Sequence, residues 1–153
     1  MEYEKAIAIR PDLPGLHLEL GEIYAGRAEW PQAEEQFRAE TTLHPGSPEA
    51  AFRLGDALVQ EGKMKEAADE LRRSDSLRPN MPETLYAMGR ALAATDAGAA
   101  EQALASMLKI EQNTPLAAQA DLLLASIHRK QGKSALASRE MEDYRRIQAL
   151  RGQ

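Results

Sequence analysis

Hydrophobic residues between Pro48 and Met81 recur every three or four positions, which is the period of an α-helix. The pattern breaks once, at Glu61-Gly62-Lys63, where glycine permits the left-handed backbone that ends many helices. Ser47 and Pro48 form a helix start signal, and Pro79 closes the second run. The stretch therefore predicts two amphipathic helices that are joined by a short turn and pack against each other as a hairpin.

The same pattern returns along the whole chain. A Leu-Gly pair in the first helix recurs at steps of 34 residues, and the fourth copy follows after a step of 36. A small and a large residue of the second helix also recur, with steps of 34, 36 and 34 residues, and a period of 34 is typical of a helical solenoid. The three columns are Leu20-Gly21, Leu54-Gly55, Met88-Gly89 and Leu124-Ala125; Ala33, Ala67, Ala103 and Ala137; and Phe37, Leu71, Met107 and Met141. We assign the two extra residues to the turn Ala93–Gly98, and we expect Pro11, Pro45, Pro79 and Pro115 to close the units.

These columns resemble the tetratricopeptide repeat (TPR) family. The resemblance implies an all-α fold, a right-handed α-solenoid of antiparallel helix hairpins, in one domain that covers 1–153. The expected units are a half repeat at 1–13, repeats at 14–47 and 48–81, a repeat with a two-residue insertion at 82–117, and a final repeat with an extended C-terminal helix at 118–153. Glu40, Ile110 and Tyr144 depart from the family pattern, because they occupy a site that is usually small.

The first residues predict only the second helix of a repeat. Tyr3 falls in the large column and Ala6 in the small column, so we expect this sequence to be a fragment of a longer chain. An apolar face around Ile7 then lacks its cover, and it favours weak homo-oligomers through this truncated N-terminal face. Acidic residues dominate 1–47 and basic residues dominate 118–153, which adds a weak end-to-end attraction that salt screens.

Composition narrows the function classes. The chain of 153 residues has no cysteine, which excludes disulfides and thiolate catalysis. Its net charge of −5 argues against nucleic-acid binding as the main activity. We expect no membrane span in this fragment, because no apolar run approaches about 20 residues. The compartment is not readable from the sequence: a cytoplasmic location is favoured, and a periplasmic one stays open.

In the TPR family the first helix of each hairpin lines the concave side, so the resemblance implies a groove there. Leu18, Phe52, Tyr86 and Leu122 form an apolar ladder in this interpretation, and charged residues flank it. An apolar strip with a few charges suits an extended or helical peptide. The alternative is that the four ladder residues only cover helix junctions. The predicted groove residues are Leu18, Glu19, Glu22, Phe52, Arg53, Asp56, Tyr86, Arg90, Leu122 and Ser126.

The sequence matches neither the carboxylate-binding site of TPR co-chaperones nor a common catalytic or metal-binding motif. TPR co-chaperones hold a C-terminal carboxylate with basic and amide side chains, whereas the matching places here hold residues such as Glu22, Asp56 and Ala87. We therefore predict no carboxylate-clamp binding. No catalytic, cofactor or metal residues are predicted, since the three histidines lack metal-ligand spacing and no phosphate-binding loop occurs. Trp30 is interpreted as a packed turn residue.

The sequence thus predicts a scaffold or adaptor that is not an enzyme. It binds a protein or peptide partner in its concave groove and needs no cofactor. Two alternatives stay open, which are a regulatory or substrate-docking TPR region of a larger enzyme and a self-assembly module. The identity of the partner is not encoded in the repeat pattern, because the family shares a scaffold and not a ligand.

Overall fold

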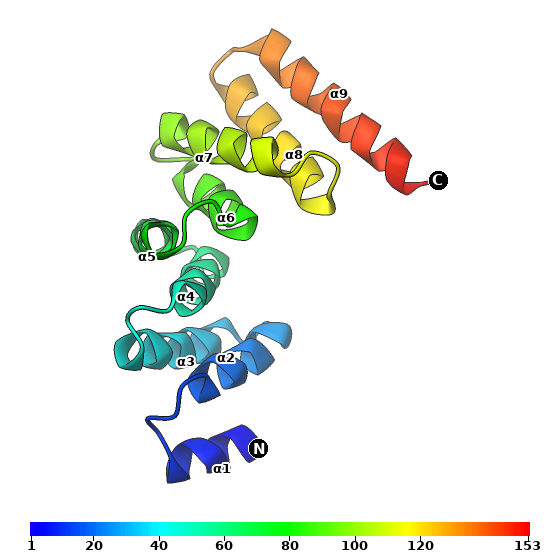
Figure 1. The fold of residues 1–153 in the computed structure, drawn as a ribbon. Coiled ribbons are helices and arrows are strands. Elements are labelled where there is room, and N and C mark those ends of the chain that lie inside the picture. The colour runs from blue at the N-terminus through cyan, green and yellow to red at the C-terminus, as the bar shows by residue number, and fades with distance from the viewer. The chain divides into compact units, whose positions relative to one another are not determined.

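The computed structural model describes residues 1–153, and the chain is entirely helical with no strand (Figure 1). Most helices follow one another after three or four residues, which makes neighbours run antiparallel. The all-α fold of helix hairpins that the pattern predicted is therefore confirmed. The helices are α1 (Glu2–Ile9), α2 (Leu16–Gly26), α3 (Trp30–Leu43), α4 (Pro48–Gln60), α5 (Met64–Leu77), α6 (Pro82–Leu92), α7 (Ala97–Ile110), α8 (Pro115–Lys130) and α9 (Ser134–Arg151).

The chain divides into two compact units, Met1–Pro79 and Asn80–Gln153. The first unit contains α1 and the hairpins α2–α3 and α4–α5, with α3 packed against α4 and α1 against α2. The second contains the hairpins α6–α7 and α8–α9, with α8 packed against both helices of the preceding hairpin. Each unit has its own apolar core, which is rich in alanine because small side chains let helices approach closely.

Side-chain caps and left-handed turns set the helix ends. Ser47 accepts a hydrogen bond from the Ala50 amide at 3.1 Å, which confirms it as the N-cap of α4. The turn after α4 contains Gly62 at φ 78°, and the corresponding turn after α2 contains Ala28 at φ 57°. An alanine in this region is strained, because its Cβ crowds the backbone. The turn after α2 is therefore held in place by the structure around it, because the backbone preference of Ala28 does not favour it.

The glycine in the first helix of three repeats marks where the two helices of the hairpin touch. A Cβ atom on Gly55 would lie 2.6 Å from Cγ of Leu71, and one on Gly21 would overlap the Phe37 ring. Both large side chains are fully buried, at 0% and 1% exposure. The close approach of the first helix to the second is therefore possible only where the first helix carries no side chain.

The third hairpin corrects the predicted register. A Cβ on Gly89 would meet Leu104 at 2.6 Å, so Leu104, and not Met107, occupies the place of Phe37 and Leu71. The turn before α7 carries no insertion. The additional residues lie instead at the start of α8, where Pro115 precedes Ala125 by ten positions, whereas Pro82 precedes Gly89 by seven. The assignment of Pro115 as a closing proline was wrong, because it begins α8.

Glu40 explains one departure from the family pattern. The N-cap of α2 is Gly15, which has no side chain to cap the helix. The carboxylate of Glu40, on α3, accepts hydrogen bonds from the Gly15 amide at 2.9 Å and the Leu18 amide at 3.3 Å. Ser74 holds the same place in the next hairpin, and its hydroxyl donates to the Pro48 carbonyl at the start of α4. The column thus ties the second helix to the start of the first.

Replacing Gly55 by alanine tests the glycine contact. We expect a loss of about 1–2 kcal/mol in the free energy of unfolding, because overpacking outweighs the gain of helix propensity. Gly26→Ala is the matched control, since Gly26 is also helical and its Cβ would meet nothing within 4 Å. Urea titration followed by circular dichroism measures both variants. Equal stability changes in the two variants would contradict the contact.

Removing the Glu40 carboxylate tests the cap. Glu40→Ala leaves two amides at the start of α2 without their acceptor, and we expect a loss of about 2 kcal/mol or more in unfolding free energy. Glu35→Ala on the same helix is exposed and should change stability by less than about 0.5 kcal/mol. Hydrogen exchange at the Leu18 amide should accelerate in the first variant alone. Unchanged exchange there would show that the carboxylate does not cap α2.

Candidate functional site

The predicted groove residues all lie on the first helix of a hairpin. Leu18, Glu19 and Glu22 are on α2 and Phe52, Arg53 and Asp56 on α4, all in the first unit. Tyr86 and Arg90 are on α6 and Leu122 and Ser126 on α8, all in the second unit. We describe the two sets separately, because they belong to different compact units.

The ladder residues differ widely in exposure. Phe52 is 8% exposed, Leu18 and Tyr86 are half-buried, and Leu122 is 39% exposed. The Arg53 guanidinium carbon lies 5.5 Å from the centre of the Phe52 ring and covers it. For Phe52 this burial favours the alternative that the ladder residues cover helix junctions. Any ligand would meet Arg53 before it met the ring.

One cavity of about 340 Å³ in the first unit collects three of the predicted residues, Glu22, Arg53 and Asp56. It lies between the C-terminal half of α2, the start of α3 and the middle of α4. The predicted turn residue Trp30 is the first residue of α3, is half-buried and also lines this cavity. The remaining lining residues are apolar or lack a side chain: Ala25, Gly26, Phe37 and Ala57. Apart from its position at a turn, nothing in the sequence indicates that Trp30 lines a cavity.

Carboxylates dominate the charge around this cavity. The Nε atom of Arg53 lies 3.0 Å from a carboxylate oxygen of Glu22 and 3.0 Å from one of Glu49. One cation is thus shared between two anions, and Asp56 adds a third carboxylate. The cavity therefore combines an apolar wall with a net negative rim, which attracts basic groups and repels a free carboxylate.

The predicted residues of the second unit form two pairs. Tyr86 and Arg90 lie one turn apart on α6, and Leu122 and Ser126 one turn apart on α8. The two helices contact each other. Tyr86, Arg90 and Ser126 are half-buried, so this surface offers an aromatic ring and a guanidinium that are partly accessible.

A second charged cluster, on α3 and the turn before α5, joins two helix pairs. Lys63 Nζ and Arg38 Nε both lie 2.6 Å from the Glu34 carboxylate, and Arg38 also reaches Glu66. Lys63 is partly exposed and connects the turn before α5 to α3. Lys63 Nζ also lies 3.3 Å from the Glu61 carboxylate, so the Glu34 and Glu61 carboxyl groups lie close together. Hydrogen bonds to Glu34, those from Lys63 and Arg38 among them, outweigh burial and lower the pKa of Glu34 to about 2, whereas burial and the nearby Glu34 raise the pKa of Glu61.

Two of the three histidines contact polar side chains of neighbouring helices. His17 Nδ1 lies 2.9 Å from the Gln36 side chain, and the buried His128 lies between Glu101 and Glu140, at 3.5 and 3.1 Å. No group of three or more potential ligands is placed to hold a metal ion. No helix is both long enough and apolar enough to span a membrane.

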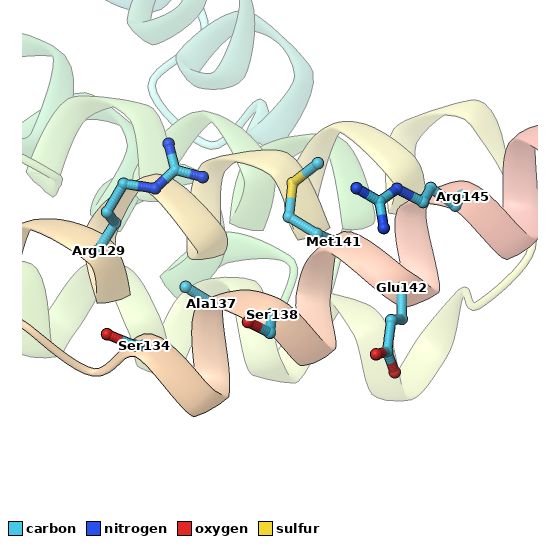
Figure 2. A pocket seen from close by; sticks show the side chains of 7 residues that line it. All are labelled: Arg129, Ser134, Ala137, Ser138, Met141, Glu142 and Arg145. Carbon is cyan, nitrogen blue, oxygen red and sulfur yellow. The ribbon is translucent and has the colours of Figure 1, made fainter.

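Two further cavities lie in the second unit. The first, of about 390 Å³, runs along α9, and Figure 2 shows Met141 between the guanidinium groups of Arg129 and Arg145. The second, of about 300 Å³, is lined by residues near the end of α7 and on α8 and α9, and it includes Asp121. Asp121 is 4% exposed and stands in the column that holds His17, Ala51 and Leu85 in the other repeats. A charged residue in a core column is a signal that the sequence itself contains.

Known proteins identify the fold. The family model for the tetratricopeptide repeat matches residues 18–82. The solved structure of MamA is 19% identical with a TM-score of 0.89, over 98% of this chain and 86% of that one. MamA of Desulfovibrio magneticus RS-1 is 14% identical with a TM-score of 0.87, over 96% and 82%. YrrB, described as a TPR protein with an unusual peptide-binding site, is 19% identical with a TM-score of 0.83, over 96% and 75%. No curated protein sequence matches.

The closeness of Glu34 and Glu61 predicts a pH effect, because a proton on Glu61 relieves the repulsion between the two carboxylates. The raised pKa of Glu61 gives stability that is present below its ordinary value and is lost as pH rises through its folded pKa, where two carboxylates face each other. Glu61→Gln supplies a permanent donor in place of that proton. We expect the variant to gain melting temperature over the wild type as pH rises from 5 to 8, and to show little difference at pH 4.5.

Lys65→Gln, at an exposed position in the same region, is the control. It should change the melting temperature by the same amount at low and at high pH. A Glu61→Gln variant whose melting temperature tracks the wild type at every pH would show that the two carboxyl groups do not interact.

Proposed function

We propose that this chain, whose residues 18–82 match the tetratricopeptide repeat model and whose helices have that fold, binds a peptide with a basic side chain in the cavity of the first unit. Repeats of this type are typically non-enzymatic scaffolds for protein interactions. The observation that carries the proposal is the cavity itself, in which Trp30 and small apolar residues lie beside Glu22 and Asp56.

The chemistry of the lining favours an arginine or lysine side chain. Its aliphatic stem packs against the Trp30 ring and Ala57, and its charged end meets the carboxylates of Glu22 and Asp56. Arg53, held by Glu22 and Glu49, lies on the same rim and is available to an acidic residue that follows in the peptide. An apolar wall with a few fixed charges is the usual composition of a ligand site.

Two further points support a peptide as the partner. YrrB, which has this fold, is described as a TPR protein with an unusual peptide-binding site. The negative rim also fits the expectation that a chaperone carboxylate tail is not the ligand. Leu18 and Glu19 on α2 stay proposed contacts for the flanking residues of the peptide. Tyr86, Arg90, Leu122 and Ser126 stay proposed contacts for a protein partner on the second unit by itself. Phe52 then supports the site from beneath Arg53.

The single tryptophan makes the proposal measurable, because Trp30 is the chain's only Trp and lines the cavity. We expect a positional library of acetylated hexapeptides to select arginine or lysine at one position, and the selected peptide to change the Trp30 fluorescence. The Glu22→Gln/Asp56→Asn variant should bind it about tenfold or more weakly, which corresponds to about 1.4 kcal/mol.

Glu35→Gln removes a carboxylate from an exposed position on α3 outside the cavity, and it should leave the affinity unchanged. Selection of acidic peptides, or equal binding by the double variant, would refute the proposal.

A further inference from the structure

The second unit contains a buried carboxylate without a partner. Asp121 on α8 is 4% exposed and forms no hydrogen bond or ion pair. Its side chain lines a cavity of about 300 Å³ whose other walls are Leu108, Gln112, Arg139, Asp143 and Arg146. Burying a charge without compensation is costly, and large charged side chains are rarely buried alone. The position therefore calls for a cation.

The cation is not supplied by the neighbouring arginines. Arg146 donates to Asp143 at 3.2 Å and to Asn113 at 3.1 Å, so its guanidinium is already engaged. Arg139 is exposed at the rim and forms no ion pair of its own. Other carboxylates face Asp121: Asp143 and Glu140 add to the negative field, and Glu140 is bound to His128. Burial first, and then these two carboxylates, outweigh the opposing charge of Arg146 and raise the pKa of Asp121 to about 6, so that it is mostly ionised at pH 7.5.

We propose that this cavity binds the alkylammonium group of a lysine side chain from a partner protein. Three of the lining side chains, Asp121, Asp143 and Gln112, carry oxygen acceptors, and an ammonium group has three N–H donors. The slender methylene stem of lysine packs against Leu108. A cavity of this size accepts one long side chain but not a folded element.

The rim adds a selectivity element. Arg139 disfavours a second cation beside the lysine and attracts an anion at that place. The site therefore selects a lysine that is followed by an acidic residue, and it discriminates against free diamines, which have a second positive charge. It shares no residue with the cavity of the first unit, and it stands or falls independently of the function proposed above.

The test uses nuclear magnetic resonance on the full ¹⁵N-labelled chain. Acetyl-lysine-glutamate-amide should shift the amide resonances of Asp121, Leu122, Arg139 and Asp143 in a saturable manner. The matched probe acetyl-norleucine-glutamate-amide has the same stem without the ammonium group, and it should not shift them. Equal shifts by both probes, or no shift by either at 20 mM, which is on the order of the weakest useful affinity, would overturn the proposal.

Asp121→Asn removes the charge with little change of shape and should weaken the lysine probe about tenfold or more. Its melting temperature at pH 7.5 should equal or exceed that of the wild type, because a buried amide costs less than a buried carboxylate. Asp69→Asn, at an exposed site in the first unit, is the control and should bind as the wild type does. Unchanged binding by a folded Asp121→Asn chain would overturn the proposal.

Two comparisons on the wild-type fold do not depend on that variant. Cadaverine should bind at least threefold more weakly than the lysine-glutamate probe, and Arg139→Gln should reduce this difference. Tighter binding of cadaverine would overturn the assignment to a protein lysine and point to a free amine. The same rank order in the Arg139→Gln variant would overturn the role of the rim.

Discussion

Three of the four hairpins depend on a close approach of their two helices at a glycine. At Gly21, Gly55 and Gly89 the first helix has no side chain, and a buried Phe37, Leu71 or Leu104 fills the space that is left. This contact places the second helix at a fixed distance, and the polar ties at the helix starts then fix its direction. Glu40 and Ser74 illustrate this, since each connects the second helix of its hairpin to the first residues of the first helix. These contacts therefore also set the distances between the helices of a hairpin on which the candidate sites lie.

The helix period, the repeat step and the start signals were sufficient to predict the all-α fold of helix hairpins, because they express local backbone preferences. The register of the third hairpin was not predictable in this way. A step of 36 residues can arise from a longer turn or a longer helix, and both place alanine and methionine in acceptable columns. Only the contact of Gly89 with Leu104 distinguishes them, and it shows that α8 is the element that lengthened. Three-dimensional packing, and not sequence spacing, decided this point.

The candidate site shows the same division. The resemblance to the family placed Glu22, Arg53 and Asp56 on the first helices, and these three line one cavity. The sequence could not show that Phe52 is covered, because its exposure depends on the side-chain conformation of Arg53, whose guanidinium lies over the ring. The sequence also did not show that Trp30 lines the cavity. Its place at a turn suggested local packing, whereas the neighbouring helix α4 provides the opposite wall of the cavity.

Residues that depart from the repeat pattern carry most of the specific chemistry. A repeat needs only small and large apolar side chains at its columns, so an acid there reduces stability unless it does something else. Glu40 resolves its cost locally, by capping a helix whose own cap position is glycine. Asp121 has no such local solution, because Arg146 is engaged elsewhere and Asp143 and Glu140 repel it. An acid that is buried, unpaired and open to a cavity is stable only if the fold tolerates its cost or a ligand removes it. The second case gives the position a function, and it makes the charge state of Asp121 the property that distinguishes this repeat from the other three.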